Sequence, residues 1–255
     1  MKDLHLLDIY RAVHEQVFLP IFVQDHFDTK TLVEACVQAG CKCIEYTLRR
    51  ADADEMIPWI VQNYPDLHVF VGSTIDNNKI VNKLKEKHKQ LLTIAELDKM
   101  GAHGFVSMMG WSLESITKYS SRCIIIPAAM TMTEALQQTG AGAHFIKMLG
   151  TDLDFAKRCR AAPTFDFCPI MITGGMTLER MKDGFAAGAM IIGSGFDLIL
   201  KDQPNNISCS DISAKLKAYV DTAKATRNQI YPQLADTQNL TTDQWLKVLP
   251  HYHCF

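Results

Sequence analysis

The stretch GCKCIEYTLRR, Gly40 to Arg50, combines a buried-looking strand with two charged side chains. Residues 42–47 are mostly apolar or β-branched, which is typical of a strand in a protein core. One carboxylate, Glu45, lies inside this strand, and Arg49 follows four residues later. Charged side chains are rarely buried unless they have partners or a function. We therefore ask which fold would bring an acid and a cation to the end of such a strand.

Seven further short apolar runs resemble this one, and segments with helical periodicity lie between them. Residues 29–40 space their apolar side chains at helical intervals and end on a glycine. Residues 131–142 begin with Thr131, three residues before Glu134, which is a capping-box pattern. The eight predicted strands are residues 18–23, 42–47, 67–72, 104–108, 123–127, 144–148, 169–173 and 189–193.

Eight strands alternating with helices predict an α/β protein with a (β/α)8 TIM barrel over residues 1–200, preceded by an N-terminal amphipathic helix. An open, doubly wound parallel sheet is the alternative, although no GxGxxG follows the first strand. The pattern changes after Leu200. A turn-like segment, an amphipathic helix over 211–231 and further helical turns near the C-terminus predict a helical extension, residues 201–255, packed on the barrel.

Composition limits the classes of function. The chain has 255 residues, of which 47% are hydrophobic and 21% charged, so it can bury a core. A net charge of −2 gives no footprint for nucleic acid or an anionic membrane. No run reaches the ~18–20 apolar residues of a membrane span, and acidic residues interrupt the N-terminal pattern, which argues against a signal peptide.

The cysteines and the C-terminal histidines do not predict a metal centre. Eight cysteines occur without a CxxC pair, mostly in apolar surroundings, so we expect reduced, packed thiols in a cytoplasmic protein. The run HYHC, residues 251–254, resembles a set of metal ligands, but Pro250 precedes it and no partner cluster is evident. We predict neither a metal nor a cofactor.

A TIM barrel carries its active site at the C-terminal ends of its strands. Residues two apart in a strand share a face, so Glu45 shares one with Cys43, and Lys147 shares one with Phe145. If both faces point inward, a lysine and a carboxylate meet at an apolar barrel mouth. The other predicted strand ends present Ser73 and Thr74, Thr173 with Gly174 and Gly175, and Gly193 with Ser194 and Gly195.

This pair of residues has a specific chemical use. Apolar surroundings favour the neutral amine of a lysine, and a neutral amine can attack a ketone to form a Schiff base. A nearby carboxylate can move the protons that this reaction requires. Glu45 and Arg49 could instead form a structural ion pair, and the glycine runs could be ordinary turns. Exposed N–H groups in the last two loops of a barrel also commonly bind phosphate.

The chain resembles a family at this point: the 2-keto-3-deoxy-6-phosphogluconate (KDPG) and 4-hydroxy-2-oxoglutarate aldolases, which are class I pyruvate aldolases. The resemblance covers roughly residues 5–200. It is carried by LPIFV, AGCKCIEYTLR, VGSTIDN, GAHGFVS, IIPAAMTMTEAL, GAHFIKML, ITGGMT and IIGSGF, in order and at similar spacing.

The resemblance implies a role for each matching residue. Lys147 falls where the family has its Schiff-base lysine, and Glu45 looks like its acid/base glutamate. Arg49 looks like the arginine that binds the substrate carboxylate. Thr74 matches the threonine near that carboxylate. The residues that match positions beside the substrate and its phosphate are Thr173, Gly174, Gly175, Gly193 and Ser194.

The implied function is a lyase that cleaves KDPG to pyruvate and glyceraldehyde 3-phosphate without a cofactor, as a homotrimer. The chain departs from the family at Met148–Thr151, where an aromatic residue and Phe-Pro-Ala are usual, and at Ser107–Met109 and Pro127–Ala128. These changes line the mouth. The substrate could therefore be 4-hydroxy-2-oxoglutarate or the galactonate analogue of KDPG. The protein could also be a diverged barrel that binds a keto acid or phosphosugar without cleaving it.

Overall fold

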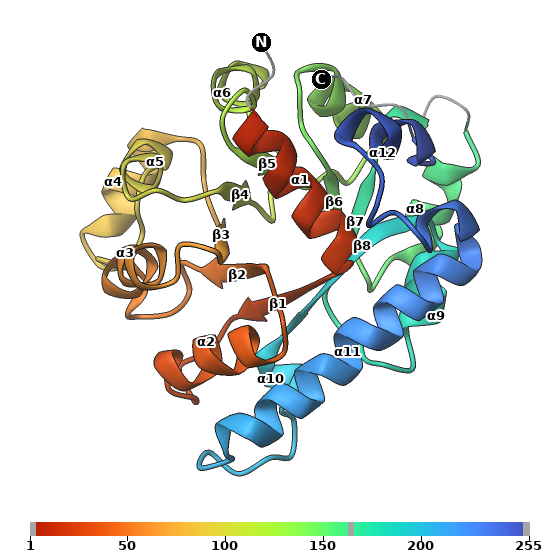
Figure 1. Cartoon of the computed structure of the whole chain (residues 1–255). Coiled ribbons are helices and arrows are strands. Elements are labelled where there is room, and N and C mark those ends of the chain that lie inside the picture. Colours follow the sequence, from red (N-terminus) through yellow and green to blue (C-terminus); the bar gives the residue numbers. More distant parts are fainter. Residues whose placement is uncertain (1–3, 163–165, 252–255) are drawn as a thin grey trace.

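All eight predicted strands are present in the computed structural model, which describes residues 4–162 and 166–251 (Figure 1). They alternate with helices along the chain, so the predicted (β/α)8 TIM barrel is confirmed. The strands are β1 Phe18–Phe22, β2 Cys43–Thr47, β3 His68–Gly72, β4 Gly104–Val106, β5 Ile124–Ile126, β6 Ile146–Leu149, β7 Ile170–Thr173 and β8 Ala189–Gly195.

The sheet runs in the order β5-β4-β3-β2-β1-β8-β7-β6, and all its pairs are parallel. Its two end strands meet through a parallel bridge between Ala128 and Lys147. The Lys147 N–H donates to the Pro127 carbonyl at 2.8 Å, and the Lys147 carbonyl accepts from the Ala129 N–H at 3.2 Å. These bonds close the ring, so the alternative of an open sheet is wrong.

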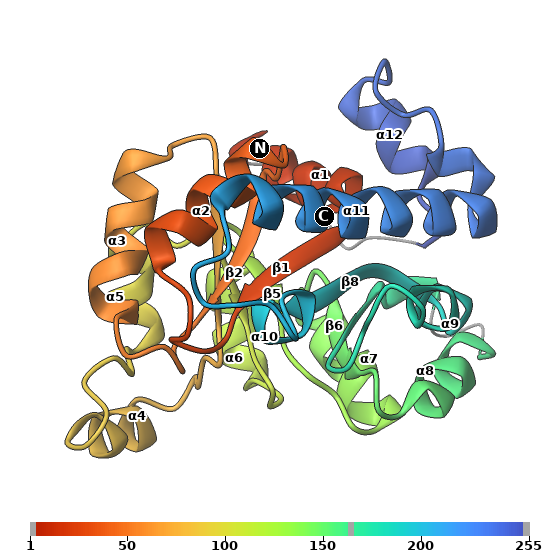
Figure 2. The same ribbon diagram turned by 90° about the horizontal axis from the view of Figure 1, so that it is seen from below.

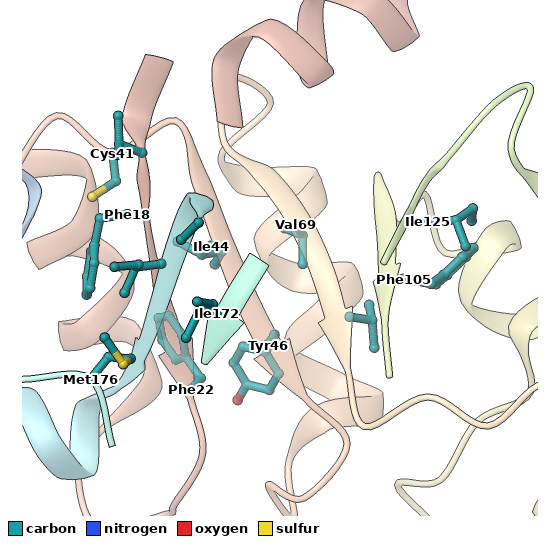
Figure 3. Close-up of a cluster of buried hydrophobic side chains, with 14 of the residues drawn as sticks. Phe18, Phe22, Cys41, Ile44, Tyr46, Val69, Phe105, Ile125, Ile172 and Met176 are labelled. Carbon is teal, nitrogen blue, oxygen red and sulfur yellow. The ribbon is translucent and has the colours of Figure 1, made fainter. Parts of the chain in front are cut away.

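The side chains of each strand alternate between two separate apolar clusters. The outer cluster fills the space between the sheet and the surrounding helices, and Figure 3 shows part of it, including Phe18, Ile44, Val69 and Phe105. The inner cluster fills the barrel and contains Leu19, Cys43, Phe70, Ile124, Phe145 and Met171. Cys43 and Phe145 therefore face inward, as the alternation predicts, and so do Glu45 and Lys147 two residues further along their strands.

The helices after β1 to β7 cover the outside of the barrel (Figures 1 and 2). The two sequence patterns that predict where helices end and begin are both confirmed. The turn after α2 contains Gly40 at φ +79°, and Thr131 and Glu134 form a reciprocal capping box at the start of α7. These helices are α2 Thr29–Gln38, α3 Ala53–Asn63, α4 Asn78–Lys85, α5 Ile94–Lys99, α6 Leu113–Tyr119, α7 Met132–Gly140, α8 Leu153–Arg160 and α9 Met181–Ala186.

The chain after β8 continues through α10 Phe196–Ile199 to α11 Cys209–Ile230, a 3₁₀ turn at Pro232–Leu234 and α12 Thr242–Val248. The long helix α11 matches the helix expected over 211–231. It packs against α2, α9 and β1, and so occupies the place in the outer ring between the helices that follow β7 and β1 (Figure 1). The helical segment after residue 200 thus contacts the barrel directly.

The N-terminal helix α1, Leu4–Gln16, covers the end of the barrel where the strands begin (Figure 1). Ile9, Tyr10 and Val13 belong to the same apolar cluster as the barrel interior. Trp245 of α12 packs on Tyr10, with 5.8 Å between the ring centroids, and Arg11 donates to the carbonyls of Leu240 and Thr237. This end of the barrel is closed, which leaves the opposite end for a site.

Candidate active site

Lys147 and Glu45 approach each other inside the barrel, towards the end opposite α1. The Lys147 Nζ lies 3.8 Å from the Glu45 Oε1, and the residues are 4% and 1% exposed. The second carboxylate oxygen, Oε2, is buried and has no hydrogen-bond partner among the described residues. A buried polar atom without a partner is costly in a folded protein. A carboxylate that lies beside the lysine amine and keeps one oxygen unused suits a group that exchanges protons with a bound molecule.

Gly72, at the end of β3, makes room for this carboxylate. A β-carbon at residue 72 would overlap the Glu45 Oε1 and would lie 2.9 Å from the Thr47 methyl group. A glycine is therefore required here by close packing. No motif of the sequence indicates this residue, because the need for a glycine comes from the register of the strands: Gly72 pairs with Thr47, which lies two residues beyond Glu45 in β2.

Thr74 is completely buried where β3 leads into its loop. Its N–H and its hydroxyl both donate to the Val106 carbonyl, at 3.2 and 2.9 Å. The Ser107 hydroxyl donates in turn to the Thr74 carbonyl at 2.8 Å. Ser73, which connects the end of β3 to Thr74, has φ +62°, a left-handed conformation that is uncommon for residues other than glycine. These bonds join the ends of β3 and β4 into one rigid rim of the mouth.

The two arginines after β2 have different environments. Arg49 is exposed, with no hydrogen bond or ion pair to another residue of the described ranges. Arg50 is 2% exposed and is held by the Tyr46 hydroxyl at 2.9 Å, the Asp52 carboxylate at 3.2 Å and the Gln24 carbonyl at 2.5 Å. Arg49, which is predicted to bind a substrate carboxylate, therefore lies at the rim. The neighbouring Arg50 instead links the loop after β1 to the turn after β2.

The charged groups around Arg50 stabilise each other. Burial alone would lower the pKa of Arg50, but the hydrogen bond to Asp52 raises it overall. Burial would raise the pKa of Asp52, and its bonds to Arg50 and Tyr46 lower it instead. The pKa of Tyr46 is raised by burial and by its bond to Asp52. Arg50 and Asp52 thus stay ionised and Tyr46 stays neutral, so the turn that carries Arg49 is fixed in place.

The loops after β7 and β8 differ in accessibility. Thr173 is buried at the end of β7, whereas Gly174 and Gly175 are exposed and have φ of +87° and +65°. Gly193 and Ser194 are buried, and the Ser194 hydroxyl donates to the Met176 carbonyl at 2.7 Å. Of the predicted phosphate-binding residues, only the pair after β7 offers backbone groups directly to solvent.

Two other features of the molecule lie apart from these residues. A cavity of about 770 Å³ lies beside α12, lined in part by Leu246, Leu249 and His251, and none of the predicted site residues lines it. Within residues 4–162 and 166–251, no group of three or more His, Cys, Asp or Glu side chains is arranged to hold a metal ion. Most of the run HYHC lies outside these ranges. No described helix is long and apolar enough to cross a membrane.

Comparison with known proteins agrees with the motifs. No family model matches the chain. The chain is 24% identical to the 2-dehydro-3-deoxy-6-phosphogalactonate aldolase of Escherichia coli (strain K12) over 190 residues, which cover 73% of this chain and 86% of that protein.

Solved structures show the same fold. A native KDPGal structure superimposes with a TM-score of 0.63 at 20% identity, covering 82% of this chain and 95% of that one. The KDPG aldolase of Legionella pneumophila, with pyruvate captured as a covalent carbinolamine, gives a TM-score of 0.57 at 16% identity, covering 87% and 97%. The resemblance of this chain to the KDPG and 4-hydroxy-2-oxoglutarate aldolase family, which its motifs indicate, is thereby confirmed.

Proposed function

We propose that the protein is a class I aldolase that cleaves a 4-hydroxy-2-keto acid through a Schiff base on Lys147. The observation that carries this proposal is the buried contact of 3.8 Å between the Lys147 amine and the Glu45 carboxylate inside the barrel. An amine can be the nucleophile and a carboxylate the proton carrier of such a reaction. The similarity to a KDPGal aldolase and to a KDPG aldolase that captures pyruvate covalently supports the same chemistry.

The reaction begins when the neutral Lys147 amine attacks the C2 carbonyl carbon of the substrate. The carbinolamine takes up a proton, loses water and becomes a protonated imine. Removal of the proton from the C4 hydroxyl then breaks the C3–C4 bond. Its electron pair moves towards the imine nitrogen, which leaves an enamine and releases an aldehyde. Protonation at C3 and hydrolysis give pyruvate and free lysine. Glu45, acting through a water molecule, carries these protons.

The substrate that we propose is KDPG, which would give pyruvate and glyceraldehyde 3-phosphate. 4-Hydroxy-2-oxoglutarate and the galactonate analogue of KDPG are alternatives, and the relative from Escherichia coli favours the latter. In each case Arg49 would bind the C1 carboxylate by charge-assisted hydrogen bonds, because it is exposed at the rim and has no acidic partner there. Thr74 and Thr173 would line the same part of the site.

Phosphate binding is proposed for the loops after β7 and β8, through Gly174, Gly175, Gly193 and Ser194. Small residues allow backbone N–H groups to approach an anion closely. The exposed Gly174 and Gly175 support this assignment better than the buried Gly193 and Ser194 do.

A barrel that binds a keto acid or phosphosugar without cleaving it is the competing function. The departures from the family at Met148–Thr151 favour it, because they follow Lys147 directly. Incubation with pyruvate, reduction with borohydride and mass spectrometry separate the two. An aldolase gains one reduced pyruvate on Lys147, whereas a binding protein stays unmodified.

We propose a homotrimer in the cytoplasm, on the strength of the family resemblance, and no metal or organic cofactor. Light scattering of the purified protein at several concentrations measures the assembly, and a monomeric mass at every concentration would contradict it.

A further inference from the structure

Arg180 lies at the mouth of the barrel and is not one of the predicted site residues. It immediately precedes α9, and its side chain reaches back over two loops. One guanidinium nitrogen donates to the Gly175 carbonyl and another to the Gly150 carbonyl, each at 2.6 Å. Gly175 belongs to the loop after β7, and Gly150 lies three residues beyond Lys147 at the end of β6.

The segments that Arg180 joins are in close contact. The Gly150 N–H donates to the Thr173 carbonyl at 2.7 Å, and a β-carbon at residue 150 would overlap the Gly174 carbonyl. The guanidinium therefore lies where the end of β6, the strand that carries Lys147, meets the exposed glycine loop after β7. This point is on the same rim as the predicted lysine.

Arg180 retains capacity to bind an anion. A guanidinium has five N–H donors, of which the two carbonyls use two. Arg180 forms no ion pair with a carboxylate in residues 4–162 and 166–251. Hydrogen bonding to Thr177 lowers the pKa of the acid next to Arg180 in the chain, Glu179. The half-buried positive charge thus faces exposed backbone with unused donors.

The neighbouring loop after β8 has the opposite character. The Asp197 carboxylate lies against Gly195, close enough to overlap a β-carbon there, and the Ser194 hydroxyl is already bonded to Met176. Of the two loops proposed above for phosphate, the one after β8 therefore carries a carboxylate that disfavours an anion, whereas the one after β7 is joined by Arg180. The glycine patterns of the loops after β7 and β8 are alike, but the charges of Arg180 and Asp197 make the two loops different for an anion.

We infer that Arg180 binds the terminal anion of the substrate, a phosphate or carboxylate at the end of the aldehyde half. This inference rests on the aldolase function proposed above. It assigns the distal group to the β6 and β7 side of the mouth, whereas Arg49 would hold the carboxylate at C1.

The test compares Arg180→Gln with Lys182→Gln, which removes a nearby exposed cation on α9. Three substrates are used: KDPG, 4-hydroxy-2-oxoglutarate and 4-hydroxy-2-oxopentanoate, whose distal end is a neutral methyl group. Arg180→Gln is expected to lower kcat/KM about 10- to 100-fold for a substrate with a distal anion and by less than about threefold for the neutral one. Lys182→Gln should match the wild type. A loss with KDPG alone identifies phosphate, and one with 4-hydroxy-2-oxoglutarate alone identifies a carboxylate.

An equal loss for all three substrates would mean that Arg180 only fastens Gly150 to Gly175, and this result, like no loss at all, overturns the inference. Pyruvate trapping by borohydride tests the aldolase function separately, since pyruvate has no distal group and Arg180→Gln should still form the adduct. Binding of inorganic phosphate at constant ionic strength, followed by thermal shift, requires no turnover. It should weaken about tenfold or more in Arg180→Gln only. Equal phosphate binding by both variants, together with no selective loss for 4-hydroxy-2-oxoglutarate, also overturns the inference.

Discussion

Glu45 and Lys147 meet across the axis of the barrel, because β2 and β6 lie opposite each other in the closed ring of eight strands. Each side chain is held by its own strand, and neither depends on a loop for its position. Sites on regular elements are held more precisely than sites on loops. The contact therefore depends on closure of the barrel, and residues about a hundred positions apart are joined only by the fold.

Replacement of Lys147 should abolish covalent capture of pyruvate. Lys147→Met keeps an apolar chain of similar length in the barrel, so the fold should persist, but no amine remains to form a Schiff base. Lys147→Arg should be equally inactive, because a guanidinium stays protonated and cannot attack a carbonyl. The measurement is borohydride trapping with peptide mapping, with circular dichroism to check the fold. An adduct on a different lysine in either variant would show that the assignment is wrong.

Glu45→Gln should separate adduct formation from turnover. The amide keeps the shape of the side chain but cannot carry a proton, so some adduct should still form while kcat falls about 10²–10⁴-fold. Stopped-flow kinetics and quantitative trapping measure the two steps. Glu34→Gln, on the exposed face of α2, is a control that should leave both steps unchanged. Full turnover in Glu45→Gln would falsify the role of this carboxylate.

Gly72→Ala should impair the site through Glu45. The added methyl group overlaps the carboxylate, so Glu45 or β3 must shift, which costs typically 1–3 kcal/mol for an overpacked core and displaces the proton carrier. Urea unfolding and kcat are measured for Gly72→Ala, Glu45→Ala and the double variant. In the double variant the stability cost of the methyl group should shrink, since Glu45→Ala removes the carboxylate that this methyl group overlaps. Gly140→Ala, with open space around residue 140, is the control. Additive costs would contradict the proposed overlap.

The sequence predicted the strands well because each depends on a local pattern. Inward and outward side chains alternate along β2 and β6, so Cys43, Glu45, Phe145 and Lys147 could be assigned to one side from spacing alone. Strand limits shifted by one or two residues, as at β4, where the predicted 104–108 ends at Val106. Ser107 leaves the strand pattern to bond Thr74, which is a contact with another loop.

Other features of the site depend on contacts that no local pattern contains. Nothing in the run Leu48-Arg49-Arg50 indicates which arginine is buried, because burial of Arg50 requires Asp52 and carbonyls from the loop after β1. Arg180 acquires its position from Gly150, thirty residues earlier. The need for Gly72 follows from the register of β3 on β2. The strand register, the packing of the loops and the positions of the charged groups at the mouth all depend on the closed barrel.

Stability should fall in acid because of a buried histidine at the base of β6. His144 is 5% exposed, its Nδ1 accepts from the Ile125 N–H at 3.0 Å, and burial lowers its pKa to about 3. An unfolded histidine has a pKa near 6.5. Between pH 6.5 and pH 3 the unfolded chain therefore binds a proton that the folded chain does not, so the free energy of unfolding decreases as the pH falls. From pH 7 to pH 4.5 this histidine alone should remove roughly 2 kcal/mol.

His144→Asn provides the test, because the asparagine oxygen can accept the same N–H but does not titrate in this range. Urea unfolding at pH 7 and at pH 4.5 should show a smaller loss of stability in the variant than in the wild type. Part of the loss should remain, since burial also lowers the pKa of His103 to about 4, where its Nδ1 accepts from the Val69 N–H. His88→Asn, at an exposed position after α4, is the control and should keep the wild-type difference. An unchanged difference in His144→Asn would mean that His144 does not carry the acid sensitivity, because removal of a group that binds its proton only in the unfolded chain must reduce the dependence on pH.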